Sequence, residues 1–320
     1  MYFFVNNIKK SYNSNSPVLK NLSFSMRKGE ILSFVGESGS GKTTFLRSVS
    51  GLEKLDKGLI SLNGTVLNSE NIFVKPQRRN IAYVFQDFPL FPHLTVFNNL
   101  IFNLDPAFKK NIDDLVDVTG LKTLLNRYPH QLSGGERQRV CIVRAIVREP
   151  ELLLLDEPFS NLDKKIKKSI IDYVESILEH KKITTILVTH DINNILNISD
   201  KILVFKGGVL QQYDSPQKMY CHPSNCYCAE LLGDLNELNF QGKKHYIRPE
   251  HIKIVERSEY ELNIIKSLFQ GKDYKVKATH NHNEFHFYSK YFYEPKTTLH
   301  FDFNPKNLIF FNKKCESYFT

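Results

Sequence analysis

The stretch Ile31-Leu32-Ser33-Phe34-Val35-Gly36-Glu37-Ser38-Gly39-Ser40-Gly41-Lys42-Thr43 joins a short, mainly apolar run to a glycine-rich loop. Residues 31–35 predict a buried strand, and residues 36–43 fit the pattern G-x-x-x-x-G-K-[ST] between a strand and a helix. Glycines let the loop backbone approach a phosphate, and the following helix directs its free N–H groups at the anion. In such a loop Lys42 reaches the β- and γ-phosphates and the Thr43 hydroxyl binds Mg²⁺. The stretch therefore predicts a nucleotide site.

A second motif is an apolar run that ends in two carboxylates, Leu152-Leu153-Leu154-Leu155-Asp156-Glu157. Such a run predicts a buried strand that delivers acids to its carboxyl end, where ligands bind in α/β sheets. Asp156 suits the coordination sphere of Mg²⁺, and Glu157 is placed to activate a water molecule as general base. The alternative is a strand followed by an acidic turn, which the glycine-rich loop upstream makes the weaker interpretation.

The third motif is Leu132-Ser133-Gly134-Gly135-Glu136-Arg137-Gln138-Arg139. Ser-Gly-Gly at the start of a predicted helix is a further anion-binding helix N-terminus. One chain seldom needs two such sites unless two copies share them.

These three motifs, in this order and spacing, resemble the ATPase subunits of ABC transporters over about residues 1–234. The resemblance implies an ATP hydrolase coupled to transport, with ATP and Mg²⁺ as cofactors. It also implies that Tyr12 stacks on adenine, that Gln86 joins Mg²⁺ and the attacking water to the membrane partner, and that His190 contacts the γ-phosphate. Residues 160–163, Ser-Asn-Leu-Asp, match the loop that crosses the dimer interface.

The family pattern implies a composite site shared by two subunits. Residues 133–135 of one subunit cap the ATP held by the glycine-rich loop of the other, in a closed two-fold homodimer. The catalytic residues expected are Glu157, His190 and Gln86, and the metal ligands are Thr43, Gln86 and Asp156. The nucleotide-binding set comprises Tyr12, Gly36, Glu37, Ser38, Gly39, Ser40, Gly41, Lys42, Thr43, Thr44, Ser133, Gly134, Gly135, Gln138 and Asp163.

Short apolar runs alternate with helical patterns through the first two-thirds of the chain. Strands are predicted at residues 31–35, 81–85, 151–155, 184–188 and 202–205, and a helix at 164–180. The alternation favours an α/β architecture with a mainly parallel sheet. With the resemblance, the expected fold is a P-loop NTPase, a RecA-like core with an α-helical subdomain at about 87–150, within a domain of residues 1–234.

Residues 235–320 are rich in Lys, Asn, His, Tyr and Phe and show strand-like alternation, as at residues 284–288 and 299–303. They predict a small all-β domain, a partly closed OB-like barrel. Tyr246-Ile247-Arg248-Pro249-Glu250-His251-Ile252 resembles a strand of the TOBE barrel appended to bacterial import ATPases, which implies an accessory domain and favours import over export.

Residues 76–86, 90–96, 119–121 and 127–133 resemble most the ferric-ion import ATPases. The resemblance implies a permease partner and, indirectly, an extracytoplasmic substrate-binding protein. Importers of polyamine, sulfate, molybdate or sugar remain alternatives, because this chain does not contain the parts that select the substrate. No apolar run approaches the roughly 20 residues of a membrane span. The expected location is therefore peripheral, at the cytoplasmic face of the inner (plasma) membrane.

The chain carries 43 Lys and Arg against 34 Asp and Glu, a net charge of +9. This charge permits a rival function, a soluble ABC ATPase acting on nucleic acid or ribosomes. Because the basic residues are scattered and no coiled-coil insertion appears, no nucleic-acid partner is expected.

His280, His282 and His286 leave one question open in the C-terminal part. On a single strand their even spacing would place three imidazoles on one face, as a metal site needs. The favoured interpretation is the polar face of an exposed strand and hairpin.

Overall fold

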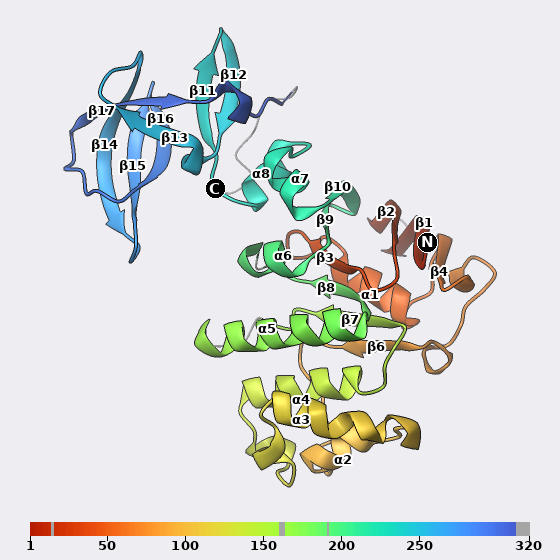
Figure 1. Cartoon of the computed structure of the whole chain (residues 1–320). Helices are drawn as coiled ribbons and strands as arrows, with labels where there is room; N and C mark the ends of the chain where they lie inside the picture. The colour runs from red at the N-terminus through yellow and green to blue at the C-terminus, as the bar shows by residue number, and fades with distance from the viewer. Residues whose placement is uncertain (14–15, 160–163, 191, 312–320) are drawn as a thin grey trace. The chain divides into compact units, whose positions relative to one another are not determined.

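The chain divides into two units, residues 1–216 and 217–320, each of which is described by itself. In the computed structural model (Figure 1), residues 1–13, 16–159, 164–190 and 192–311 are described. Asp163 and the rest of the expected interface loop at 160–163 therefore lie outside the described residues.

The central sheet of the first unit has the order β10-β9-β3-β8-β7-β6. Its parallel strands are β3 (Ile31–Val35), β6 (Ile81–Val84), β7 (Leu152–Asp156), β8 (Thr184–Val188) and β9 (Lys201–Lys206). An antiparallel strand, β10 (Val209–Asp214), forms one edge. Every residue of β3, β7 and β8 is buried, as continuous apolar runs in a parallel sheet require. The predicted mainly parallel sheet is confirmed, with strand ends within a residue of those expected.

Helices connect the parallel strands, since a parallel pair needs a crossover. They are α1 (Lys42–Ser50) after β3, α5 (Lys164–Lys181) between β7 and β8, and α6 (Ile192–Ile198) before β9. Ile171, Val174 and Leu178 form a buried stripe on α5 at helical spacing. The helix predicted at 164–180 is thereby confirmed.

A second, antiparallel sheet was missed by the sequence analysis. It has the order β2-β1-β4-β5 and comprises β1 (Phe3–Asn13), β2 (Ser16–Met26), β4 (Lys57–Leu62) and β5 (Thr65–Ser69). In β1 the alternation of Phe3 and Val5 breaks before Ile8, because the register shifts there and Asn7 has a φ of 47°. A strand whose period is interrupted by a bulge carries a weaker sequence signal.

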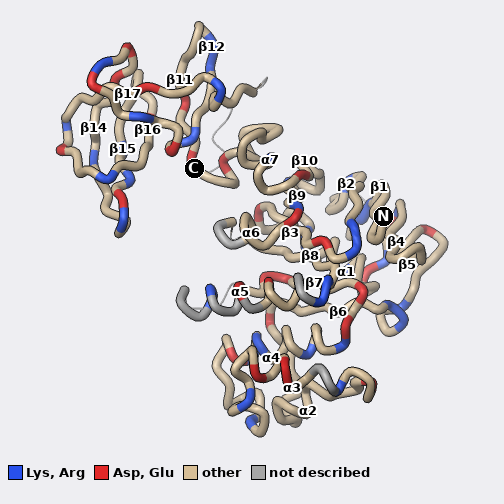
Figure 2. The backbone as a smooth tube through the Cα atoms, viewed as in Figure 1, with Lys and Arg blue, Asp and Glu red and all other residues tan. Residues whose placement is uncertain are grey.

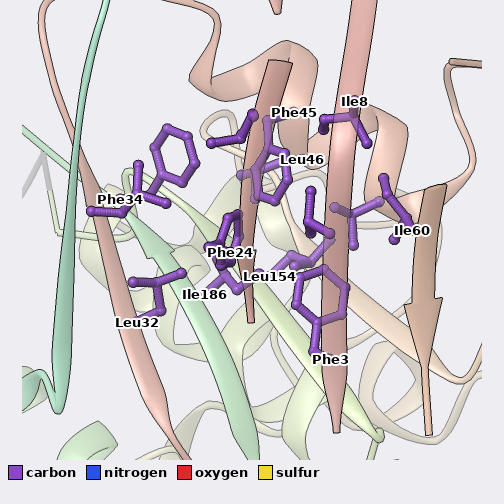
Figure 3. Close-up of a cluster of buried hydrophobic side chains, with 14 of the residues drawn as sticks. Phe3, Ile8, Phe24, Leu32, Phe34, Phe45, Leu46, Ile60, Leu154 and Ile186 are labelled. Atoms are coloured by element: carbon purple, nitrogen blue, oxygen red, sulfur yellow. The ribbon is translucent and has the colours of Figure 1, made fainter. Parts of the chain in front are cut away.

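A cluster of buried side chains joins this second sheet to the central one (Figure 3). Phe45 of α1 stacks on Phe34 of β3, with ring centroids 5.0 Å apart and an 18° interplanar angle. On its other side Phe45 packs against Phe24 of β2 at 5.6 Å. Aromatic contacts on two sides hold α1, and with it the loop that precedes α1, in a fixed orientation.

The helices between β6 and β7 fall within the expected range 87–150. They are α2 (Val96–Ile101), α3 (Ile112–Val118) and α4 (Gly134–Ile146), with 3₁₀ turns η2 (Pro106–Asn111), η3 (Lys122–Leu124) and η4 (Pro129–Gln131). A further 3₁₀ turn, η1 (Pro76–Arg78), precedes β6. The helix α4 packs on α2 and on the edge strand β6. Whether residues 87–150 act as a separate subdomain stays a prediction.

The second unit is largely β-structure, as expected. Its five-stranded antiparallel sheet has the order β13-β17-β14-β15-β16: β13 (Ile252–Val255), β14 (Tyr260–Phe269), β15 (Tyr274–His280), β16 (Asn283–Ser289) and β17 (Thr298–Phe303). A separate hairpin is made of β11 (Asn236–Phe240) and β12 (Lys243–Ile247), and η5 (Pro249–His251) and η6 (Pro305–Asn307) are single turns. The side chain of Asn236 in β11 bonds to the backbone of His286 in β16, as a neighbouring strand would. Its amide N–H donates to the His286 carbonyl oxygen and its amide oxygen accepts from the His286 N–H, both at 2.7 Å.

The division between the units falls before the expected boundary after residue 234. The reason lies in Arg248, which is 1% exposed. Its guanidinium donates to the carbonyl oxygen of Gly233 at 2.7 Å and lies over the ring of Tyr220 at 4.2 Å. These contacts tie α7 (Pro216–Cys221) and the segment that follows α8 (Cys226–Leu231) to the β-structure.

The three histidines do not share a face, so the metal-site alternative is wrong. A two-residue turn at Asn281 and His282, both with positive φ, separates β15 from β16. His280 points inward and its Nδ1 donates to the carbonyl oxygen of Glu261 at 2.8 Å, whereas His286 pairs with Lys277 on the opposite face. Among the described residues no group of three His, Cys, Asp or Glu side chains could hold a metal ion.

Candidate active site

The glycine-rich loop runs from the end of β3 at Val35 to the first residue of α1, Lys42. Two of its glycines lie too close to other backbone for a side chain. A Cβ on Gly36 would lie 2.0 Å from the carbonyl oxygen of Phe205, and a Cβ on Gly41, whose φ is 108°, would lie 2.8 Å from that of Val18. The first turn of α1 has no side-chain cap, so its N–H groups face the loop. The loop geometry fits an anion such as phosphate.

Lys42 turns back into the loop. Its Nζ donates to the carbonyl oxygens of Gly36 at 2.8 Å and Glu37 at 2.7 Å. Burial lowers the pKa of Lys42, and the nearby carboxylates of Glu157, Asp156 and Glu37 oppose that shift. A buried ammonium at the centre of the loop suits a multiply charged phosphate chain.

Asp156 ends β7 with 5% of its surface exposed. Its carboxylate accepts hydrogen bonds from the hydroxyls of Thr43 and Tyr83, the latter 2.9 Å from Oδ2. Burial raises the pKa of Asp156, and these two hydrogen bonds oppose the rise. Burial, and then the Asp156 charge, raise the pKa of Tyr83, which keeps its hydroxyl protonated as a donor. From the sequence alone Tyr83 is only a residue of a predicted strand, and its one signal is a hydroxyl in an otherwise apolar run.

Glu157 and His190 come together at the carboxyl ends of neighbouring strands β7 and β8. His190 Nδ1 lies 2.8 Å from Glu157 Oε2, and the imidazole side chain is 63% exposed against 18% for the carboxylate. The backbone N–H of Glu157 donates to the carbonyl oxygen of Val188, and its φ of 49° is unusual for a residue other than glycine. The turn thus aims Glu157 away from the strand direction and toward the surface that carries Lys42 and Asp156.

Two further expected residues lie near the same edge of the sheet. The hydroxyl of Tyr12 lies 3.4 Å from the Thr44 hydroxyl, beside the first turn of α1, and Tyr12 is an exposed residue. Gln86 follows β6, the neighbour of β7, and is exposed. Both are available to a ligand from solution.

Ser133 begins α4 with a capping box. Its hydroxyl accepts from the backbone N–H of Glu136 at 3.3 Å, and its own N–H donates to the Glu136 carboxylate at 2.7 Å. Because α4 packs on β6, three strand positions from β3, this segment and the glycine-rich loop belong to separate parts of the sheet.

Gln138 differs from the expectation of a nucleotide-facing side chain. It is 0% exposed, and its amide has no hydrogen-bond partner within the described part of the chain. At helical spacing from Ser133, the Gln138 side chain faces the interior rather than the surface that Ser133 and Gly134 expose.

The oxygen donors present fit Mg²⁺. The Thr43 hydroxyl and the Asp156 carboxylate are in hydrogen-bond contact, so two hard oxygen ligands converge beside the phosphate-type loop. The Gln86 side chain would add an amide oxygen from the next strand. Mg²⁺ prefers a few protein oxygens together with phosphate oxygens to a cage made only by the protein.

A groove of about 530 Å³ lies between β6 and α4, and Phe85, the residue before Gln86, is part of its lining. Its lining combines aromatic, aliphatic and guanidinium groups: Tyr83, Phe85, Pro89, Leu90, Phe91, Phe102, Arg144 and Arg148 among them. Such a mixture is typical of a surface that receives another protein segment.

Comparisons with known proteins agree with this geometry. A family model described as ABC transporter matches residues 19–160. The chain is 38% identical over 256 residues to the sulfate/thiosulfate import ATP-binding protein CysA of Nocardia farcinica, covering 78% of this chain and 75% of that protein. The chain belongs to the ABC transporter ATP-binding proteins. It is an importer-type ATPase, in which ATP hydrolysis is coupled to transport.

Other relatives carry different substrates in their names. The chain is 39% identical to the spermidine/putrescine import ATP-binding protein PotA of Legionella pneumophila (74% of this chain, 65% of that protein). It is also 39% identical to the Fe(3+) ions import ATP-binding protein FbpC 2 of Haemophilus influenzae (72% and 66%).

Among solved structures, the dimeric ATP-binding cassette MJ0796 bound to ADP and Pi matches with a TM-score of 0.59 and 29% identity, over 67% of this chain and 98% of that chain. CbiO1 of Clostridium perfringens, part of a cbiONQ transporter complex, matches with a TM-score of 0.61 and 27% identity, over 68% and 90%. Within the described residues, no helix combines the length and the apolar character needed to cross a membrane.

Proposed function

We propose that this chain powers import as a homodimer that hydrolyses two ATP molecules at composite sites. The observation that carries the proposal is the pairing of Glu157 with His190, 2.8 Å apart, beside Lys42 and Asp156 at one edge of the sheet. Glu157 would accept a proton from the attacking water as general base, and His190 would hold the carboxylate and contact the γ-phosphate.

The second subunit follows from the position of residues 133–135. They open α4 on the β6 side, away from the glycine-rich loop of the same chain. A helix N-terminus with exposed Ser133 and Gly134 suits a phosphate held by another copy. Each subunit would then supply Lys42 to one ATP and Ser133 to the other, with Asp163 in the interface. Tyr12 would stack on adenine.

Mg²⁺ is the proposed cofactor, held by Thr43, Asp156 and Gln86 together with the phosphates. When bound, it would offset negative charge on the phosphate oxygens during hydrolysis. The residues of this chain would orient the nucleotide, exclude water other than the attacking one and move the proton through Glu157.

The groove between β6 and α4 is the proposed binding site for a segment of the permease. Phe85, which precedes Gln86 in the chain, lines this groove, so a bound permease segment would respond to a change at Gln86. The chain would thus lie at the cytoplasmic face of the plasma membrane, attached through the permease. A substrate-binding protein outside the membrane would act indirectly, and the C-terminal β-unit would be a TOBE-like accessory barrel.

Ferric iron is the proposed substrate. It is supported by the resemblance of residues 76–86 and 127–133 to the ferric importers. The identities of 38–39% to sulfate, polyamine and ferric importers do not separate these substrates. Sulfate and polyamine are therefore the competing outcomes of the test.

The test is uptake of labelled ferric iron, sulfate and spermidine by cells that lack this chain. We expect iron uptake alone to fall, and to return with the wild-type chain but not with Glu157→Gln. Loss of sulfate or spermidine uptake instead would replace the substrate and keep the importer function. Uptake restored in full by Glu157→Gln would contradict the proposed chemistry.

The rival, an ATPase acting on nucleic acid, has less support. Figure 2 shows Lys and Arg distributed over both units and interspersed with Asp and Glu rather than gathered in one stripe. A nucleic-acid site needs a concentrated basic surface, and its binding weakens steeply with salt. Salt-sensitive RNA or DNA binding by the purified chain would favour the rival.

A further inference from the structure

Tyr83 makes a contact with the catalytic centre that no motif predicts. Its hydroxyl donates to Asp156 Oδ2 at 2.9 Å across 73 positions of sequence. We propose that Tyr83 is a positioning residue that orients the Asp156 carboxylate for metal-bound ATP. The inference rests on the proposed role of Asp156 in binding Mg²⁺.

The register of the sheet explains how Tyr83 reaches this position. The strands β6 and β7 are parallel neighbours, and Tyr83 lies beside Leu154. Alternate residues of a strand share a face, so the Tyr83 ring and the Asp156 carboxylate extend from the same side of the sheet. The carboxylate begins two residues, about 6.6 Å, farther along. A tyrosine side chain is long enough to reach across this two-residue offset along the strand. A phenylalanine fills nearly the same volume but has no hydroxyl to donate to the carboxylate.

The ring is itself held in place. Tyr83 stacks on Phe85 with centroids 4.1 Å apart and an interplanar angle of 28°. It also packs against the hydrophobic cluster of the first unit. A hydroxyl on a fixed ring is a directional donor, whereas an aspartate side chain alone rotates broadly about its terminal bond.

The two donors to Asp156 differ in what binding does to them. Thr43 is itself a proposed metal ligand: its hydroxyl oxygen would bind the metal through a lone pair while its O–H remains on the carboxylate, so this contact would move with the loop and its ligand. Tyr83 lies on β6 and contacts Asp156 independently of the loop. Its hydrogen bond to Asp156 Oδ2 comes from a strand and not from the loop, so it would keep the carboxylate oriented when a nucleotide binds and leave the site preorganised.

Tyr83→Phe is the direct test, because it removes only the hydroxyl. The matched control is Tyr213→Phe. Tyr213 is a half-buried tyrosine of the same unit whose hydroxyl donates to the Ser25 carbonyl oxygen at 2.6 Å. Both variants lose one hydrogen bond from a tyrosine hydroxyl, but only the first loses one to Asp156.

The primary measurement is binding of a fluorescent ATP analogue to the full chain, in EDTA and at graded Mg²⁺. For Tyr83→Phe we expect the ATP affinity in EDTA to be unchanged. Mg²⁺ increases the ATP affinity, and the Mg²⁺ concentration that produces half of this increase should rise about tenfold, because the variant loses one hydrogen bond to a charged group. Tyr213→Phe should match the wild type in both conditions. The Mg²⁺ dependence of ATPase activity should shift in the same direction.

The outcomes separate this inference from the function on which it rests. A wild-type chain that binds ATP equally with and without Mg²⁺ would overturn the metal role of Asp156. A Mg²⁺-dependent wild type with an unshifted Tyr83→Phe would overturn the positioning role alone. An equal shift in Tyr213→Phe would show a general effect of lost stability and would also overturn it. Melting temperatures of both variants confirm that each is folded.

Discussion

His190 Nδ1 lies 2.8 Å from Glu157 Oε2, and this contact joins the ends of the parallel strands β7 and β8. The histidine is the more exposed partner and the glutamate sits deeper, beside Asp156 and Lys42. A carboxylate held in this way can receive a proton from water without leaving its position.

Glu157→Gln should abolish turnover but leave an ATP-bound dimer. The amide keeps the shape of the side chain and cannot act as a base, so we expect ATP hydrolysis to fall by about 10²–10⁴-fold. Phosphate release gives the rate, and gel filtration with ATP detects the dimer. Hydrolysis at the wild-type rate would rule out the general-base role.

Lys42→Ala should reduce ATP affinity by at least about tenfold, because the phosphates lose a charge-assisted hydrogen-bond partner. Lys206→Ala is the control: Lys206 lies near the loop, 3.6 Å from the Glu37 carboxylate, whereas the carbonyl oxygens of Gly36 and Glu37 accept hydrogen bonds from Lys42. Equilibrium binding of labelled ATP is the measurement. Equal losses in both variants would indicate a net-charge effect instead of a specific contact.

Arg79→Met should destabilise the first unit. The buried guanidinium donates to four backbone carbonyl oxygens, those of Val74, Ser48, Val49 and Leu67. The carbonyl oxygens of Ser48 and Leu67 also accept from Asn68 Nδ2 and the Val74 N–H, but those of Val74 and Val49 lose the guanidinium. Leaving a buried carbonyl without a donor costs roughly 1–3 kcal/mol before the site relaxes, so we expect a loss of a few kcal/mol. Thermal and urea unfolding measure the loss. Arg78→Met is the control, because Arg78 is the exposed neighbour of Arg79. The unfolding free energy of this variant should equal that of the wild type.

Glu136→Gln should lower the stability of the fold near neutral pH, and this loss of stability should disappear in acid. The hydrogen bond from the Ser133 backbone N–H lowers the pKa of Glu136 below its ordinary value of 4.5. A depressed carboxyl pKa stabilises the fold above the unfolded-state value, and this contribution is lost as pH falls through the folded-state value. The melting-temperature difference between variant and wild type should therefore shrink from pH about 7 to pH about 4. A difference that does not change with pH would mean that the charge of Glu136 is not involved.

Local pattern was enough for the parallel strands and for the elements that carry the ATP site. Residues 31–35 and 184–188 are strands with the predicted ends, because a run buried on both faces is recognisable without its neighbours. The Ser133 capping box is likewise local, since Ser133 and Glu136 bond to each other's backbone. The glycine-rich loop is local because its carbonyl oxygens accept from Lys42 a few residues farther on.

What the sequence by itself determined is thus a set of local elements: a glycine-rich loop before a helix, two acids at a strand end and a capped helix start at Ser133. The tertiary structure decided which side chains meet. Tyr83 reaches Asp156 and Glu157 meets His190 only because parallel strands distant in sequence end at one edge of a sheet. The turn at Asn281 and His282 likewise places His280 and His286 on opposite faces, although their even spacing on a single strand would place them on one face. These outcomes depend on strand order and register, which arise from long-range packing rather than from local pattern.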